Sequence, residues 1–197
     1  MPRLVDHDQR RETIAAAACK AIARQGIDAV TLGDIGDQAD CTTGAITHYF
    51  ADKDAVLLAA LDLVIKRLND RMARAIEHDP VDLRAFLAES LPIRRESREG
   101  IKVWYSFWTR TFSSAALTRR QRDMHIRWYD RLVERLTLVA DADRLKPDVD
   151  IAFEAETIAA LVNGIGLRSV LDAKEWPAER QLAHLDAYLD KILVQPS

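Results

Sequence analysis

The sequence predicts an all-α fold. Seven glycines and six prolines in 197 residues leave long stretches without helix breakers, and apolar residues recur there at intervals of three and four, the period of a helix. Alternation of apolar and polar residues never lasts long enough to predict a sheet. Because 48 % of the residues are hydrophobic, a chain of this length can form one packed domain or a small head on a larger body.

The first part of the chain predicts a head of three helices. Residues 1–7 are expected to form an arm, and the first helix is expected at residues 8–25, with a stripe of alanines and isoleucines to bury. Gly26 follows the last apolar position, where a glycine commonly ends a helix. This helix would brace the two shorter helices that come next.

Those two short helices, predicted at residues 31–38 and 43–50, form the central motif of the head. Thr31 can cap the first helix, and Asp34, three residues on, can bond back as in a capping box. Thr42 can cap the second helix. A helix, a short break and a second helix are the pattern of a helix-turn-helix, which either binds DNA or serves only for packing.

The outward face of the second helix favours DNA binding. A helix fits the major groove, where short polar side chains and methyl groups read base edges. Gly44 costs this helix about 1 kcal/mol relative to alanine, so it indicates close approach to a phosphate backbone or to a neighbouring helix. Lys53 opens a long helix, where the free amides also attract a phosphate. The residues expected to contact DNA are Thr31, Thr42, Thr43, Gly44, Ala45, Thr47, His48, Tyr49 and Lys53.

The same segment carries a family resemblance. TTGAITHYFADKDAVL resembles the signature of TetR-type repressors, in which a recognition helix ends in an aromatic pair and a lysine opens the next helix. ETIAAAACKAIARQGIDAVTLGDIGDQADC resembles the two helices before it. The resemblance implies a dimeric, ligand-responsive repressor that binds palindromic operator DNA and is released by a small molecule. Residues 1–52 would then form the DNA-binding domain, and residues 53–197 the ligand-binding and dimerisation domain.

Charge limits how this head can bind DNA. The chain has a net charge of −3, and residues 1–53 hold six basic and eight acidic side chains, 6 − 8 = −2. A protein that binds nucleic acid mainly by charge would be basic. DNA binding is therefore expected to depend on a few well-positioned Lys and Arg side chains, on hydrogen bonds from uncharged groups and on helix N-termini. A dimer would make each of these contacts twice.

The rest of the chain predicts a body of long helices. Asp52 can cap a helix that runs to about residue 77, and further helices are expected at residues 81–91, 94–112, 115–140, 151–171 and 177–194. LPIRRESREGIKVWYSFWTRTF and AETIAALVNGIGLRSVL resemble the BetI-like branch of the TetR family, which includes a choline-responsive repressor. Asn163 stands where an acidic residue is common in that branch.

Aromatic residues gather in two adjacent helices of the body. Aromatics at helical spacing are often plain core, but packed tryptophan and tyrosine rings also make a wall for a flat or cationic ligand. The expected ligand-binding residues are Trp104, Tyr105, Trp108 and Trp128. The ligand is expected to be an aromatic or lipophilic compound or a quaternary ammonium, with the neutral compound favoured because no body carboxylate can be assigned to a cation.

Two glycines in the helix at residues 151–171 indicate close helix packing. These glycines can lie at a homodimer interface, which the final helix would also help to form. Alternatively, they can pack against another helix of the same chain. The residues expected at the dimer interface are Asn163, Gly164, Gly166, Leu167, Leu185 and Leu189.

Other classes find little support in the sequence. No glycine-rich phosphate loop, no G-x-S-x-G segment and no metal spacing among the five histidines predicts an enzyme, a cofactor or a metal site. A helical adaptor without DNA binding would show a damaged recognition helix, and this one is intact. Two distant cysteines predict no disulfide framework. Since no membrane span or signal peptide is apparent, the cytoplasm is the expected location.

Overall fold

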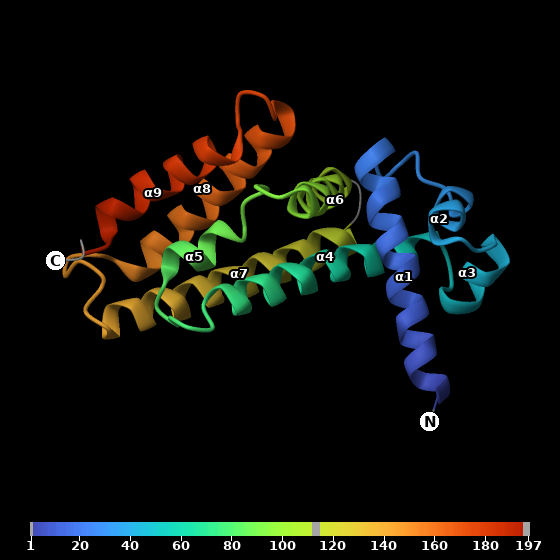
Figure 1. Ribbon diagram of the computed structural model, residues 1–197, viewed down its shortest axis with the longest axis horizontal. Helices are drawn as coiled ribbons and strands as arrows, with labels where there is room; N and C mark the ends of the chain where they lie inside the picture. Colours follow the sequence, from blue (N-terminus) through green and yellow to red (C-terminus); the bar gives the residue numbers. More distant parts are fainter. Residues whose placement is uncertain (1, 112–114, 195–197) are drawn as a thin grey trace. The chain divides into compact units, whose positions relative to one another are not determined.

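A computed structural model describes residues 2–111 and 115–194 of the chain. Its regular secondary structure in those ranges consists of helices joined by turns and loops, with one isolated bridge between Leu145 and Leu193. This confirms the predicted all-α class (Figure 1). The helices are α1 (Pro2–Gln25), α2 (Leu32–Ala39), α3 (Thr43–Tyr49), α4 (Lys53–Ala75), α5 (Leu83–Ala88), α6 (Arg95–Thr111), α7 (Ala115–Asp141), α8 (Ile151–Leu171) and α9 (Ala178–Ile192).

The chain forms two compact units. The first contains Met1–Arg67 together with Glu99–Arg110, and the second contains Leu68–Arg98 together with Thr111–Ser197. The first unit therefore includes α1, α2 and α3 with most of α4 and α6. These packing units differ from the functional division at residue 52, which remains a prediction.

The core of the first unit lies between α1, α2, α3 and α4. The apolar stripe predicted for α1 is buried, and it packs with the inward residues of α2, α3 and α4, among them Ile35, Ile46, Phe50 and Leu57. Gly26 ends α1 with a positive φ of 83°, and its amide donates to the Ile22 carbonyl over 2.9 Å. The glycine cap was predicted correctly.

The start of α1 was predicted wrongly. The arm expected at residues 1–7 is helical from Pro2 onward. Proline fits the first turn of a helix because its missing amide hydrogen would have no partner there, and no glycine or second proline follows before residue 26. Residue 1 lies outside the described residues.

The core of the second unit lies between α5, α7, α8 and α9. Helix α8 packs against α7 and α9, and α5 packs against α7 and α9; Figure 1 shows α8 and α9 side by side. The buried cluster includes Leu87, Leu136, Ile158 and Leu189. Within the described ranges, no helix combines the length and hydropathy that a membrane span requires.

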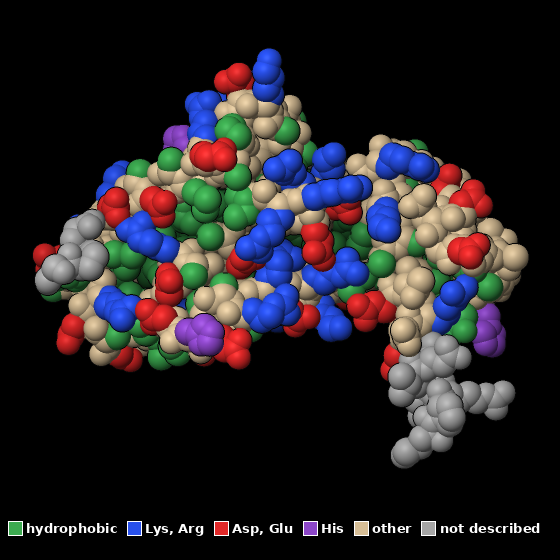
Figure 2. Space-filling view, viewed as in Figure 1, with side chains coloured by type: hydrophobic (Ala, Val, Ile, Leu, Met, Phe, Trp, Pro, Cys, Tyr) green, Lys and Arg blue, Asp and Glu red, His purple; other side chains and the backbone are tan. Residues whose placement is uncertain are grey.

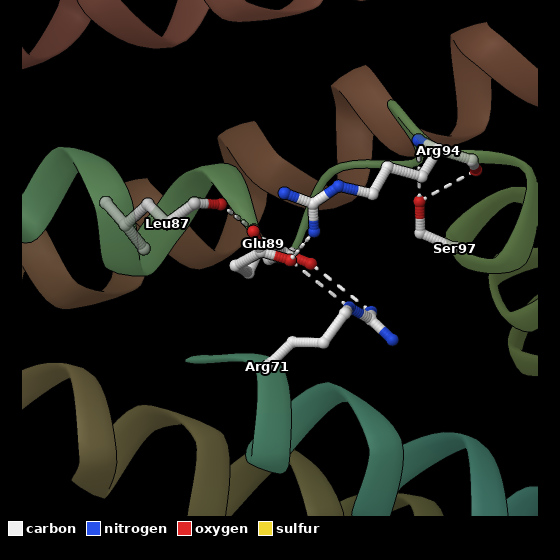
Figure 3. A network of polar contacts seen from close by, with 6 residues as sticks. Arg71, Leu87, Glu89, Arg94 and Ser97 are labelled. Atoms are coloured by element: carbon white, nitrogen blue, oxygen red, sulfur yellow. Dashed lines mark hydrogen bonds and ion pairs between the residues drawn. The ribbon is translucent and has the colours of Figure 1, made fainter. Parts of the chain in front are cut away.

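An ionic cluster ties the α5–α6 connection to α4 within the second unit (Figure 3). Glu89, whose side chain is 11 % exposed, accepts from Arg71 Nε at 3.2 Å and from Arg94 Nη1 at 2.5 Å. Ser97 Oγ donates to the Arg94 carbonyl at 2.9 Å and accepts from the Arg94 amide at 3.0 Å. The negative charge of Glu89 is therefore balanced by two arginines of the same chain.

Candidate functional site

The first helix of the motif begins as predicted. Thr31 Oγ1 accepts from the Asp34 amide at 3.1 Å, and the Thr31 amide donates to Asp34 Oδ2 at 2.8 Å, which completes the capping box. The Thr31 hydroxyl also donates to Asp34 Oδ2 at 2.6 Å. These bonds favour the charged carboxylate and lower the pKa of Asp34. The Thr31 hydroxyl is engaged in the cap, although its side chain is exposed.

The turn between α2 and α3 depends on Gly36. A Cβ atom at this position would lie 2.6 Å from the Cys41 carbonyl oxygen, a distance that side chains do not tolerate. The Cys41 amide donates to the Gly36 carbonyl at 2.9 Å, and Asp40 adopts the left-handed conformation with φ 50°. The sequence interpretation missed Gly36; the available signal was a glycine inside a helical pattern.

Helix α3 presents the predicted face to solvent. Thr42 caps it by accepting from the Ala45 amide at 3.1 Å. Ile46 and Phe50 are buried, with exposures of 0 % and 3 %, and they fix which side of the helix faces the core. The exposed residues are Thr42, Thr43, Gly44, Thr47 and His48, while Ala45 and Tyr49 are half-buried.

Gly44 has no packing role within the described chain. A Cβ atom there would meet only Thr42 Oγ1, at 3.8 Å, so the predicted close approach to a neighbouring helix is wrong. The alternative, a close approach to a phosphate backbone, stays a prediction. The exposed Thr47 donates its hydroxyl to the Gly44 carbonyl at 3.0 Å, and its oxygen can still accept a hydrogen bond.

Arg11 fastens the end of α3 to α1. Its Nη1 donates to the Tyr49 carbonyl, and its guanidinium carbon lies 4.2 Å from the centre of the Phe50 ring. The His7 ring also lies 4.8 Å from the Tyr49 ring. Arg11 therefore donates to the last carbonyl of α3, where a cation is favourable.

Lys53 occupies the first turn of α4, half-buried, beyond the Asp52 cap. Asp52 Oδ1 accepts from the Ala55 amide at 2.8 Å, as predicted. Over the face of the head drawn in Figure 2, Lys and Arg side chains are interspersed with Asp, Glu and uncharged surface. This distribution agrees with the balanced charge of the sequence and with binding through a few placed groups.

Three of the four predicted ligand-binding residues form one cluster on α6. The rings of Trp104 and Trp108 lie 6.1 Å apart, and those of Tyr105 and Trp108 lie 5.4 Å apart, edge to face. All three side chains are half-buried. Trp128 lies on α7 in the second unit, where it stacks on Phe86 at 6.2 Å. The ligand-binding role of these four residues remains a prediction.

Helix α6 is joined to the DNA-binding head inside the first unit. Arg110 Nε contacts Asp28 Oδ1 at 3.1 Å, between α1 and α2, and Arg110 Nη1 contacts Asp54 Oδ1 at 3.5 Å, in the first turn of α4. A Cβ atom at Gly100 would lie 3.2 Å from Val64 Cγ1. The aromatic cluster and the recognition helix thus belong to one packed body.

The residues expected at a dimer interface divide into two groups. Leu185 and Leu189 are 1 % and 0 % exposed within their own chain, and Gly166 is buried as well. We therefore correct their assignment to the chain's own core, because they have no surface to offer a partner. Gly164 and Leu167 are exposed and Asn163 is half-buried, its Nδ2 donating to the Ala159 carbonyl at 2.9 Å.

Two known protein families match two successive parts of this chain. The family described as "Bacterial regulatory proteins, tetR family" matches residues 14–60, and the family described as "BetI-type transcriptional repressor, C-terminal" matches residues 81–194, more than half of the chain. The chain belongs to the TetR family of transcription regulators. Its body is of the BetI type, as the sequence resemblance implied.

Relatives of this TetR-family regulator match it along almost the whole chain. It is 29 % identical over 197 residues to the HTH-type transcriptional regulator BetI of Paraburkholderia xenovorans, covering 98 % of each protein. It is 28 % identical over 202 residues to the HTH-type transcriptional regulator PksA of Bacillus subtilis, covering 99 % of this chain and 95 % of PksA. These relatives are named as regulators and not as enzymes.

Solved structures share the fold of this regulator. A putative TetR-family regulator from Rhodococcus sp. superposes with a TM-score of 0.81 at 23 % identity, over 95 % of this chain and 100 % of that one. A putative transcriptional regulator from Saccharomonospora viridis, in complex with choline, superposes with a TM-score of 0.84 at 22 % identity, over 95 % and 100 %.

Proposed function

We propose that two copies of this regulator bind a palindromic operator and block transcription, and that a small molecule bound in the body releases them. The observation that carries the proposal is the division of α3 into two faces. Ile46 and Phe50 hold one face in the core, while Thr43, Thr47 and His48 lie exposed on the other. A helix so held can enter a major groove.

Each predicted DNA contact has a distinct role. Thr43, Thr47 and His48 read base edges, Gly44 allows a phosphate to approach, and Lys53 binds a phosphate. Thr31, Thr42, Ala45 and Tyr49 line the same surface. This arrangement suits a head with little net charge, because most of these groups are neutral hydrogen-bonding or methyl groups.

Two substitutions separate these roles. Lys53→Ala removes a phosphate contact, so it should weaken binding to all sequences alike and lower the salt slope by about one unit. Thr47→Ala removes a base contact, so it should change sequence preference instead. Both are measured by fluorescence anisotropy on the DNA beside the gene. Parental binding by both variants would refute the assignment.

The homodimer is proposed to form through the exposed stripe of α8. Phe153, Leu167 and Leu171 are 62 %, 43 % and 75 % exposed, which is unusual for large apolar side chains. Together with the exposed Ala160 and Gly164, they fall on one line along the helix because their spacings are multiples of a turn. Small residues in the middle of this line would let two helices approach closely.

Leu167→Glu tests the dimer. In a two-fold interface the leucine is buried twice, so at ~1.5–3 kcal/mol for each burial the dimer should weaken by about two to four orders of magnitude. Leu138→Glu is the matched control, since Leu138 is 39 % exposed but lies on α7. Light scattering should give a monomer for the first variant and a dimer for the second. A parental protein that is monomeric at micromolar concentration would contradict the proposal.

A small molecule is proposed to bind beside Trp104, Tyr105 and Trp108 on α6. The ligand-binding role of Trp128, on α7, stays a separate prediction. The choline held by the structural neighbour from Saccharomonospora viridis supports a body that binds ligands, but it does not name this ligand. We favour a neutral aromatic or lipophilic compound over a quaternary ammonium. Release requires that the ligand bind the DNA-incompetent state more tightly.

Trp108→Ala tests the effector site. It should lower effector affinity and leave operator affinity without effector nearly unchanged, while Ile126→Ala, an exposed residue of α7, should change neither. A coupling of about 1–3 kcal/mol would let the effector weaken operator binding by about 5- to 150-fold. If no compound in a broad screen both binds and releases DNA, the effector proposal fails.

The ion pairs of Arg110 are proposed to transmit the effector signal. A ligand that shifts α6 would move Arg110, and with it the loop at Asp28 and the start of α4 at Asp54. We further propose that the protein acts in the cytoplasm, where its DNA lies, and that it needs no cofactor, metal or membrane partner.

A further inference from the structure

The exposed face of α3 lacks the side chains that make bidentate contacts with a single base. Arg and Lys bind the two acceptors of guanine, and Asn and Gln bind the donor and the acceptor of adenine. None of these four residue types occurs in α3 or at its N-cap. The exposed residues there are Thr42, Thr43, Gly44, Thr47 and His48. Base recognition by this helix must therefore use another kind of contact.

Two threonines share the exposed side of α3. Thr43 and Thr47 lie four residues apart, so they are neighbours along one side of the helix. Ile46, which is 0 % exposed, fixes the orientation in which both threonines face solvent. Each threonine carries a methyl group beside its hydroxyl. Contact with a methyl group in the major groove identifies thymine, because thymine is the one standard DNA base that has a 5-methyl group there.

The hydroxyl of Thr47 narrows the choice of base pair. It donates its proton to the Gly44 carbonyl at 3.0 Å, so this proton is not available to a base. The oxygen can still accept a hydrogen bond. An A·T pair presents the N6 donor of adenine and the methyl group of thymine, whereas a G·C pair presents no methyl group. An A·T pair therefore matches both groups that Thr47 can offer.

The charge of the head makes uncharged contacts more important. Residues 1–53 hold six basic and eight acidic side chains, and one of the basic groups, Arg11, donates to the Tyr49 carbonyl. Contact between methyl groups needs no charge, since its free energy comes from apolar surface removed from water. Such contacts can therefore add affinity and sequence preference to a head that has few cations.

We propose that α3 recognises thymine through its 5-methyl group, with Thr43 and Thr47 as the specificity-determining residues. The methyl groups of the two threonines pack against thymine methyl groups in the major groove, and Thr47 Oγ1 accepts from the N6 amino group of the paired adenine. The inference rests on the proposed operator binding and names the base that this helix selects.

Selection from random DNA with the full-length protein supplies the operator for the test. The enriched duplex is synthesised with thymine, and again with deoxyuridine at every thymine position, which removes the 5-methyl groups and keeps the base pairs. At about fourfold for each buried methyl group, a dimer whose subunits each contact one thymine should bind the thymine duplex at least about 15-fold more tightly, measured by fluorescence anisotropy. A difference below about threefold, or half-sites without an A·T pair, would overturn the proposal.

The double variant Thr43→Ser, Thr47→Ser tests the two residues, because serine keeps both hydroxyls and removes both methyl groups. Its affinities for the two duplexes should agree within about threefold. The double variant Thr43→Val, Thr47→Val keeps methyl groups and lacks the hydroxyls, so it should still prefer the thymine duplex by at least about tenfold. A serine variant that keeps the parental preference, or a valine variant that binds the operator without it, would overturn the proposal.

Thr13→Ser is the matched control on α1. Thr13 is exposed, and its hydroxyl donates to the Gln9 carbonyl at 2.9 Å, a local bond like that of Thr47. This variant should keep the parental preference for thymine. A loss of preference here as well would mean that the effect does not come from α3, and it would overturn the proposal.

The same experiment separates this inference from the proposed function. A protein that selects no sequence from random DNA would refute the proposed repressor and this inference together. A protein that selects an inverted repeat, but binds its thymine and deoxyuridine forms equally, would refute this inference alone.

Discussion

The attachment of α3 to α1 through Arg11 can be tested by substitution. Arg11→Ala removes the hydrogen bond to the Tyr49 carbonyl and the contact with the Phe50 ring at 4.2 Å. A hydrogen bond from a charged donor contributes about 1.5–3 kcal/mol, and a partly exposed cation–π contact contributes about 0.5–1 kcal/mol. Because the two share one guanidinium and Arg11 is only half-buried, we expect a loss near the lower end, about 2 kcal/mol.

Most of this loss should fall on α3 itself. The helix has seven residues, too few to be stable alone. Its last turn is closed by the Phe50 amide, which donates to the Ile46 carbonyl at 3.0 Å. A loss of about 2 kcal/mol would make exchange of this amide up to about 30-fold faster. The melting temperature should fall by about 4–8 °C.

Hydrogen exchange of the free protein is the decisive assay, because a phosphate contact by Arg11 would not change it. Arg10→Ala is the matched control, since Arg10 is the preceding residue and is also half-buried. The control should exchange like the parent at Tyr49 and Phe50. Equal exchange in the two variants would refute the bracing role of Arg11.

Three further predictions concern other parts of the chain. Arg110→Ala should leave the operator affinity of the effector-free protein within about fivefold of the parent, since exposed ion pairs contribute about 0.2–1 kcal/mol each. It should reduce the effector's influence on operator affinity by about two- to fivefold. Both affinities are measured by fluorescence anisotropy, with and without effector. Asp34→Asn should lower the urea midpoint near neutral pH, and because the pKa of Asp34 is lowered in the folded state, the difference should vanish as the pH falls below the ordinary range of an aspartate. Burial raises the pKa of Cys19 to about 11, so a thiol reagent at about pH 8 should modify Cys41 in the folded protein and Cys19 only after unfolding.

An Arg110 variant with parental coupling would remove the ion pairs from the signalling route. If the Asp34 variant differs from the parent by the same amount at all pH values, the capping carboxylate is not responsible. Rapid modification of Cys19 in the folded protein would mean that α1 and α4 separate there, because its Sγ contacts the Ala60 carbonyl at 3.4 Å.

Local chemistry made some elements predictable from sequence. Thr31 and Asp34 form the capping box that their spacing predicted, and α8 spans the predicted residues 151–171, with Asp150 accepting from two amides at its start. These features depend on a few neighbouring residues, so a pattern in the sequence contains them. The α1 start was misjudged because no residue before Asp8 signals a break, and the helix simply continues to Pro2.

Long-range contacts were not predictable in the same way. A stripe containing Leu185 and Leu189 shows that one side of α9 is apolar, but not whether its own chain or a partner covers it. Helix α8 is apolar on both sides, so the pattern alone could not separate buried Gly166 from exposed Leu167. Arg11 meets Tyr49 across 38 positions of sequence, a contact that only the fold reveals.

The central claim is that a dimer of this regulator reads DNA through the exposed face of α3. The most direct measurement is a footprint of the purified protein on the DNA that flanks its own gene, with the parent and Thr47→Ala compared side by side. We predict a protected inverted repeat whose half-site centres lie about 10–10.5 base pairs apart, or a multiple of that, and a changed sequence preference for the variant. A parent that protects no site, or a variant that protects the same sequences with equal affinity, would contradict the claim.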